Sequence, residues 1–427
     1  MIVSANAHQA SDLKQMQALP LEAKERMSAE RIKVWFESWV KYTIYDVKTK
    51  KTRTITNNSE PNKNGCLVPK KKKINGRTLE VLTVKRGTKL KSTECIDAAE
   101  DGQVYVAFSG GKDSTVLADL CARVCKQYGW TLYLLFVNTG LEYPEIQKFV
   151  KTFAEWLRTT YEIEVVLDIV RPEMRFDEVI KSYGYPVVSK EVAEIVWYVK
   201  HGKEGKTKTS RAQRLNGEWK DKNGNKSQFN CENWKFLLDA PFESASHCCG
   251  VIKKKPSQKY ARQTGRKQIV GTMACESRLR LQIWLKNGCN AFSAKRPSSQ
   301  PLSFWTNQDI LHYIKKYEVP YCSVYGDIVI DDGVDIEGQT NIIDFIGEYE
   351  PEDNLKTTGC DRTGCIFCMF GCHLEKEPNR FQRLKNTHPR QYEYCIGGGE
   401  MVDGKWQPSK EGLGLGKVLD YIGVKYD

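Results

Sequence analysis

The sequence predicts an α/β protein with a doubly wound, mostly parallel β-sheet. Apolar runs typical of buried strands alternate with segments of helical apolar spacing, and a glycine-rich turn joins the first strand to the first helix. Strands are expected at 104–108, 132–137, 164–170 and 269–271, and helices at 114–126, 144–161 and 275–285. Helices in such a fold cover both faces of the sheet.

The N-terminal part of the chain is expected to hold a helix and then a basic insertion. The helix, predicted at 21–42, carries Ile32, Trp35, Phe36 and Trp39 at helical spacing. From residue 43 to 95 the composition shifts to Lys, Thr, Asn and Gly, and short alternating pieces indicate hairpins. The pieces lie at 42–47 and 79–84, on either side of a run from Lys70 to Lys73. Partial disorder of this insertion is an open alternative.

Length and composition suggest three regions. We predict an N-terminal helix with the basic β-rich insertion at 1–100, a nucleotide-binding α/β domain at 101–320 and a cysteine-rich C-terminal region at 321–427. A hydrophobic content of 40% is enough for a substantial core. The mean hydropathy of −0.53 and the lack of a long apolar run argue against a membrane span. The N-terminus shows no secretion signal, so a cytoplasmic protein is expected.

The net charge of +12 is unevenly distributed. The stretch from Lys200 to Lys226 carries nine Lys or Arg against three acids, within a second basic insertion predicted at 200–228. Such a segment is either a solvated loop or a contact surface for nucleic acid, and the sequence leaves both open.

The turn after the first predicted strand has the chemistry of a phosphate site. It reads Ser-Gly-Gly-Lys-Asp-Ser from Ser109 to Ser114. The glycines allow close approach of the backbone to an anion, and the unpaired N–H groups of the next helix point at it. Lys112 adds a positive charge, and the serine hydroxyls add hydrogen-bond donors. The spacing is too short for a Walker A loop.

This turn resembles the pyrophosphate-loop signature of ATP pyrophosphatases and of the phosphoadenosine phosphosulfate (PAPS) reductase family. The resemblance extends over roughly 104–384, through Asn138-Thr139-Gly140, through 184–190 and through Pro301–Trp305 with Thr306, Asp309 and Tyr313. It implies an adenine nucleotide alpha-hydrolase-like fold and an enzyme that binds ATP or a sulfonucleotide, with Mg²⁺ as an optional companion. The implied nucleotide-binding residues are Ser109, Gly110, Gly111, Lys112, Asp113, Ser114, Asn138, Thr139, Gly140, Gly271, Glu276 and Arg280.

Three positions depart from the family pattern. Asn138 stands where Asp is usual, and Met273 stands where an Arg would help bind the anionic substrate. The C-terminus lacks the Glu-Cys-Gly-Ile-His tail whose cysteine attacks the sulfonucleotide in authentic reductases. Cys395 is the nearest substitute, so we predict Lys112, Asp113 and Cys395 as catalytic residues. A buried thiol without a catalytic role is the alternative for Cys395.

Fifteen cysteines in a chain without a secretion signal suggest metal ligands or catalysis rather than disulfides. Iron–sulfur members of the family hold one [4Fe–4S] cluster with a Cys-Cys pair and a later Cys-x-x-Cys. Residue by residue, this resemblance implies Cys248, Cys249, Cys365 and Cys368 as ligands. Two rivals remain open. One is a structural zinc site made by the thiols near His373, namely Cys360, Cys365, Cys368 and Cys372. The other is a buried, reduced set of thiols.

Three functions remain possible from the sequence. The first is sulfur transfer or adenylyl activation by a nucleotide-dependent iron–sulfur enzyme, similar to DNA phosphorothioation and tRNA thiolation proteins. It implies DNA or tRNA and a sulfur-donor protein as partners, and no membrane. The second is reduction of an adenylyl sulfate or PAPS. The third is a nucleic-acid-binding accessory protein with a structural zinc.

Overall fold

A computed structural model describes residues 9–56, 67–74, 77–84, 93–331 and 353–427. The chain divides into two compact units, each assembled from separate stretches. The first unit comprises Met1–Phe136, Pro144–Val170 and Lys259–Arg362, and the second comprises Val137–Tyr143, Arg171–Gln258 and Thr363–Asp427. These units divide the fold in space, whereas the three regions expected from the sequence divide it along the chain, and that division stays a prediction.

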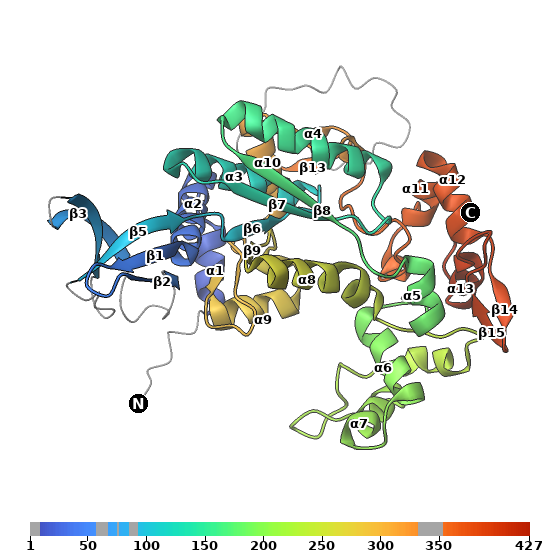
Figure 1. Cartoon of the computed structure of the whole chain (residues 1–427). Helices are drawn as coiled ribbons and strands as arrows, with labels where there is room; N and C mark the ends of the chain where they lie inside the picture. The colour runs from blue at the N-terminus through green and yellow to red at the C-terminus, as the bar shows by residue number, and fades with distance from the viewer. Residues whose placement is uncertain (1–8, 57–66, 75–76, 85–92, 332–352) are drawn as a thin grey trace. The chain divides into compact units, whose positions relative to one another are not determined.

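The first unit is built on a six-stranded sheet in the order β10-β11-β9-β6-β7-β8 (Figure 1). β6 pairs in parallel with β7 on one side and with β9 on the other, and β9 pairs in parallel with β11. The strands span Val104–Ala107 (β6), Leu132–Val137 (β7), Val165–Val170 (β8), Lys267–Ile269 (β9), Asn290–Ala291 (β10) and Ser298–Ser299 (β11). The predicted α/β class with a mostly parallel sheet is therefore confirmed.

The helices of the α/β core begin and end where local chemistry allows. α3 (Lys112–Tyr128) starts two residues before the predicted position and ends at Gly129, whose φ of 68° is the left-handed conformation of a helix C-cap. α4 spans Pro144–Tyr161 as predicted, with proline at its first position, where its missing N–H costs no hydrogen bond. Both helices bury an apolar face, which anchors them in the unit.

Later elements of this unit complete the frame. α9 (Arg278–Asn287) begins three residues after the predicted start, because Ala274–Glu276 forms a 3₁₀ turn (η3) and the Ser277 side chain caps the helix by accepting from the Arg280 N–H. α10 (Asn307–Tyr317) begins with a capping box made by Thr306 and Asp309. Downstream lie η4 (Ser323–Tyr325), β12 (Ile328–Ile330) and β13 (Leu355–Thr357).

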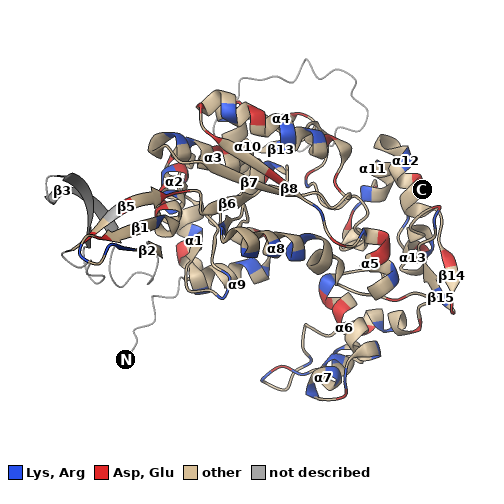
Figure 2. Ribbon diagram, in the orientation of Figure 1, with Lys and Arg blue, Asp and Glu red and all other residues tan. Residues whose placement is uncertain are grey.

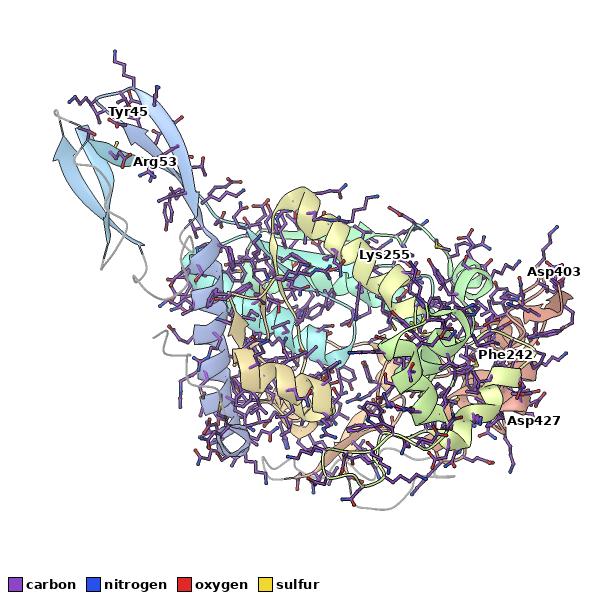
Figure 3. All side chains as sticks on the ribbon, turned by 90° about the horizontal axis from the view of Figure 1, so that it is seen from below. Tyr45, Arg53, Phe242, Lys255, Asp403 and Asp427 are labelled. Carbon is purple, nitrogen blue, oxygen red and sulfur yellow. The ribbon has the colours of Figure 1, made fainter. Side chains whose placement is uncertain are left out.

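The N-terminal elements are two helices and a five-stranded sheet in the order β2-β1-β5-β4-β3. α2 ends at Trp39, so the predicted extension to residue 42 was too long, because the chain continues into β1. Arg53, labelled in Figure 3, pairs with Glu94 at 2.9 Å. The run Lys70–Lys73 lies in β3, and its side chains lie outside the described part. The elements are α1 (Ala10–Gln17), α2 (Leu21–Trp39), β1 (Lys41–Asp46), β2 (Lys51–Thr56), β3 (Leu67–Ile74), β4 (Arg77–Val84) and β5 (Glu94–Glu100).

The second unit is mainly helical and has its own apolar core, which includes Tyr185, Phe242 and Phe381. Its elements are α5 (Phe176–Tyr183), α6 (Lys190–His201), α7 (Lys206–Leu215), η1 (Glu232–Asp239), η2 (Gly250–Lys254), η6 (Cys372–Leu374), α11 (Arg380–Thr387), α12 (Pro389–Ile396), β14 (Glu400–Val402), β15 (Lys405–Gln407) and α13 (Leu415–Tyr421). α8 (Lys255–Thr264) spans the boundary between the units along the chain. None of the helices in the described ranges is long and apolar enough to cross a membrane.

Candidate functional site

The glycine-rich turn joins β6 to α3 in a conformation that requires glycine. Gly110 has a φ of 74°, in the left-handed region that side chains disfavour. A Cβ atom at this position would lie 2.9 Å from Ile146 Cγ2 and 3.0 Å from Val150 Cγ2 on α4. Both the backbone angle and the close packing therefore exclude a side chain at this position, which keeps the turn tight.

The first turn of α3 carries the expected anion donors. Gly111 is the N-cap and offers no capping side chain, so the amides of Asp113 and Ser114, which lack an intrahelical partner, can donate to a bound phosphate. The hydroxyls of Ser109 and Ser114 lie 3.0 Å apart, and Ser114 Oγ donates to the Gly111 carbonyl at 2.8 Å. The Lys112 N–H donates to the hydroxyl of Tyr325 at 3.0 Å. The two serines thus stabilise the loop itself.

Lys112 is buried, with 5% of its side chain exposed. Its Nζ donates to the backbone carbonyl of Asp361 at 3.0 Å and lies 3.6 Å from Asp113 Oδ1. Oδ1 of Asp113 is itself buried and accepts no hydrogen bond from the described part of the chain. The buried ammonium thus has one carboxylate at ion-pair distance and one neutral carbonyl as partners, and its place at the start of α3 suits an additional anion.

The loop lies at the switch point of the sheet. β6 is the strand from which the chain order runs in opposite directions, through β7 and β8 on one side and β9 and β11 on the other. Open α/β sheets bind ligands outside the carboxyl ends of the strands at such a point. The turn after β9 approaches the same place, because a Cβ atom on Gly271 would lie 3.0 Å from the carbonyl oxygen of Asp113.

Glu276 and Arg280, predicted as nucleotide-binding residues, form an ion pair beside this turn. Glu276 also accepts from the Met273 N–H at 2.9 Å, and its second oxygen lies 3.3 Å from Arg362 NH2. Burial, and then the positive charge of Arg362, lowers the pKa of Arg280, whereas Asp113 opposes that shift. The Met273 side chain is uncharged and buried, so this position adds no positive charge to the site.

Sequence reasoning missed two residues of this site, Tyr325 and Arg362. Both reach the loop because the downstream chain doubles back. β12 and β13 pair antiparallel, and the N–H groups of Gly359 and Cys360 donate to the carbonyls of Tyr325 and Val324 at 2.8 and 3.0 Å. No local pattern in the sequence marks such a return.

The predicted residues Asn138, Thr139 and Gly140 belong to the second unit, where they form a compact turn. Thr139 Oγ1 donates to Glu142 at 2.6 Å, and the Gly140 N–H donates to Asn138 Oδ1 at 3.1 Å. The turn is tied to the cysteine-rich segment, because the Ile366 N–H donates to the Leu141 carbonyl at 2.9 Å. This hydrogen bond joins a nucleotide-family motif to the Cys-x-x-Cys turn.

The four predicted ligand cysteines lie in the second unit and influence one another electrostatically. A hydrogen bond with Cys249, together with burial, raises the pKa of Cys248, and the same bond helps lower the pKa of Cys249 to about 5. Burial raises the pKa of Cys365 to about 11 and also raises that of Cys368, and each of these two thiols is influenced by Cys249. The four thiols therefore lie close enough to influence one another's ionisation.

Lysines surround this cysteine group. Burial opposes the protonation of Lys253, but the thiols of Cys365 and Cys249 raise its pKa. Lys190, Lys253 and Lys254 favour the thiolate of Cys249. Positive charge of this kind stabilises thiolates, which are the form that binds metals.

In the described part of the chain, no three His, Cys, Asp or Glu residues have the geometry to hold a single metal ion.

The remaining cysteines of interest have different surroundings. Cys360 belongs to the first unit, whereas Cys372 is buried in the apolar core of the second. Cys395, predicted as a catalytic residue, is fully buried in that core, and burial raises its pKa well above the ordinary value. A thiol that is both inaccessible and protonated is a poor nucleophile, so we do not assign Cys395 to the reaction.

Within the basic segment 200–228, residues 206–215 form α7, and the residues after it form turns with a bridge between Lys220 and Lys226. Acidic residues lie among its basic ones (Figure 2), and Arg211 pairs with Glu194 at 2.9 Å and Arg214 with Glu191 at 2.5 Å. Lys208 and Lys226 are also paired, with Glu204 and Glu232. Much of the charge seen in the sequence is thus neutralised locally. Lys203, Lys206, Lys220 and Lys222 are exposed.

The doubly wound sheet and the loop at its switch point define a protein of the pyrophosphate-loop class. A family model for the phosphoadenosine phosphosulfate reductase domain matches residues 103–203 and 206–369, which is more than half of the chain. The chain therefore belongs to this family. The match also runs through most of the basic segment.

Other comparisons are less informative. No curated protein matches the chain. Among solved structures, the chain is similar to an NMN synthetase from Francisella tularensis, with 15% identity and a TM-score of 0.24. That match covers 51% of this chain and 62% of the other, so it spans less than two thirds of that protein's length.

Proposed function

We propose that the chain is a nucleotide-utilising enzyme that binds ATP or a sulfonucleotide at the loop Ser109–Ser114 and performs sulfur-transfer or adenylyl-activation chemistry. The observation that carries this proposal is the buried Lys112 at the start of α3, at the switch point of the sheet. A preorganised ammonium in a partly desolvated site stabilises charge that develops on phosphate oxygens. Mg²⁺ bound with the nucleotide would share that role.

The residues around the loop have separable roles in this proposal. Gly110 and Gly111 admit the phosphates, and the amides at the start of α3 bind them. Asp113, whose buried Oδ1 accepts no hydrogen bond from the described part of the chain, is a candidate acceptor for a donor group of the substrate or for a hydrated metal ion. The nucleotide-binding role of Asn138, Thr139 and Gly140, which belong to the second unit, stays a prediction from the family resemblance.

We further propose that Cys248, Cys249, Cys365 and Cys368 hold a [4Fe–4S] cluster. The proposal is supported by the mutual electrostatic influence of these thiols and by the lysines beside them. Bound there, such a cluster would supply electron-transfer or sulfur-binding chemistry. The chain itself contributes the thiolates and the positive charge that stabilises them.

Activation followed by thiolation is the reaction we favour over reduction of a sulfonucleotide. Direct reduction by the predicted nucleophile needs an accessible thiol to attack the sulfur, and Cys395 is buried. DNA or tRNA is the acceptor we propose, with a sulfur-donor protein as a second partner. Support for nucleic acid comes from the exposed lysines of the basic segment and is moderated by its internal ion pairs.

Calorimetric titration with ATP, and with adenosine 5′-phosphosulfate, tests the nucleotide site. Lys112→Ala should weaken binding at least about tenfold, which corresponds to about 1.4 kcal/mol. Lys148→Ala is the matched control, because Lys148 is an exposed lysine on α4 in the same unit. Unchanged affinity in a folded Lys112→Ala protein would remove the loop from the site.

A further inference from the structure

Glu276 holds two arginine side chains, one at each of its carboxylate oxygens. Arg280 pairs with Oε2, and Arg362 NH2 lies 3.3 Å from Oε1. The Glu276 side chain is 9% exposed, whereas those of Arg280 and Arg362 are 38% and 68% exposed. Because two guanidinium groups share one carboxylate, this trio carries a net positive charge with its cationic ends toward solvent.

Two backbone contacts bring this trio to the phosphate loop. Asp361, the residue before Arg362, accepts at its carbonyl from Lys112 Nζ at 3.0 Å. In the segment before Glu276, Gly271 packs so closely on Asp113 that a Cβ atom there would be 3.0 Å from the Asp113 carbonyl. The chain segments that carry Glu276 and Arg362 therefore both contact the loop, and the trio lies beside it.

A purely structural role does not account for Arg362. An ion pair whose arginine is 68% exposed adds little to stability, because water screens the charges and the long side chain loses conformational freedom. Its proximity to Arg280 is also unfavourable, since the charge of Arg362 contributes to the lowered pKa of Arg280. Two guanidinium groups close together are best compensated by a multiply charged anion, which their planar forks can bind through paired hydrogen bonds.

We infer that Arg362, held by Glu276 beside the predicted nucleotide-binding residue Arg280, recognises the terminal anionic group of the nucleotide bound at the loop. The inference rests on the proposed function. The ligand class is a 5′-nucleotide with a charged group beyond the α-phosphate. That group is either the pyrophosphate of ATP or the sulfate of an adenylyl sulfate, and AMP lacks it. Arg362 is thus a specificity-determining residue contributed from outside the predicted motifs.

Titration of the full chain with ATP, adenosine 5′-phosphosulfate and AMP tests this inference. Arg362→Ala should weaken the affinity for at least one of the first two ligands about tenfold or more, and that for AMP less than about twofold. The larger loss identifies which terminal group the site takes. Arg296→Ala is the control, because Arg296 is an exposed arginine between β10 and β11 of the same unit. Arg362→Lys keeps the charge without the fork and should recover part of the affinity.

The controls separate this inference from the proposal on which it rests. Equal losses for all three ligands in Arg362→Ala, or no loss, would overturn the assignment of Arg362. If Lys112→Ala weakens binding of AMP and ATP while Arg362→Ala leaves both ATP and adenosine 5′-phosphosulfate unaffected, only the present inference fails. If Lys112→Ala changes no affinity, the proposed function fails. Thermal melting of each variant by circular dichroism verifies that it is folded.

Discussion

The ammonium group of Lys112 donates a hydrogen bond to the backbone carbonyl of Asp361 at 3.0 Å, although 249 positions separate the two residues. The contact shows that the phosphate loop is completed by a distant part of the chain. It also gives Lys112 a neutral partner that a phosphate can replace, because an ammonium binds a charged acceptor more strongly than a carbonyl. Nucleotide binding should therefore displace or reorganise this hydrogen bond.

Removal of cluster ligands should distinguish the [4Fe–4S] proposal from the zinc alternative. Anaerobically purified protein should be brown and contain about four iron and four sulfide per chain. Cys248→Ser and Cys249→Ser should each lose the colour, whereas Cys360→Ser and Cys372→Ser should retain it. Elemental analysis gives the iron and zinc content of each protein, and visible absorption gives its colour. Stoichiometric zinc whose binding depends on Cys360 and Cys372 would contradict the cluster assignment.

The exposed lysines of the basic segment should determine its nucleic-acid affinity. Replacing Lys203, Lys206, Lys220 and Lys222 by Gln should weaken binding of tRNA and duplex DNA and make the slope of log K against log salt shallower by about 3. Replacing the ion-paired Lys208 and Lys226 should change the slope less, because acids already neutralise them. Fluorescence titrations at several salt concentrations measure both. Identical slopes for all proteins would identify the segment as a solvated element only.

Lys24 and Asp309 form a buried ion pair, with Nζ 2.7 Å from both carboxylate oxygens. Lys24→Met should destabilise the protein by about 3 kcal/mol, because it leaves the buried carboxylate uncompensated. Adding Asp309→Asn should restore part of this loss, since asparagine is neutral and can still cap α10. Urea denaturation of the three proteins gives the comparison. A double variant no more stable than Lys24→Met would contradict the explanation.

Glu243 should make part of the stability depend on pH. Burial alone would raise its pKa, but Lys405, His201 and Lys200 more than offset this and lower the pKa from 4.5 to about 2. Because the pKa is depressed in the folded state, the stabilisation is complete above pH 4.5 and is lost as the pH falls toward 2. Glu243→Gln should be about 1–3 kcal/mol less stable than wild type at pH 7.

The measurement is urea denaturation of wild type and Glu243→Gln between pH 7 and pH 2.5. The stability difference between them should narrow across the acid end of this range, since the unfolded wild-type chain then binds a proton at Glu243 that folding must release. A difference that stays constant with pH would show that the ion pairs of Glu243 contribute nothing. The same experiment on Glu204→Gln, which removes an exposed pair with Lys208, should show almost no effect.

Local patterns in the sequence were sufficient to predict the strands and helices at the core of the fold. The apolar run 132–137 and the amphipathic segment 144–161 became β7 and α4 at the predicted residues, because strand and helix periodicity is a local property of the chain. The loop Ser109–Ser114 was equally recognisable, since glycine, lysine and serine at fixed spacing between a strand and a helix carry their chemistry within six residues. Where helix ends were misplaced, as at Cys275, a short 3₁₀ turn and a serine cap intervened.

Other features depended on contacts between distant segments. A count of charges could not predict that Arg211 pairs with Glu194 and Arg214 with Glu191. The sequence around Cys395 likewise did not predict that its side chain is completely buried. The return of β12 and β13, which brings Tyr325 and Asp361 to Lys112 and Arg362 to Glu276, has no local signature. The sequence by itself therefore determined the fold class, the family and the phosphate loop. The tertiary structure alone decided which distant side chains complete the site, because burial and pairing depend on packing between segments far apart in the chain.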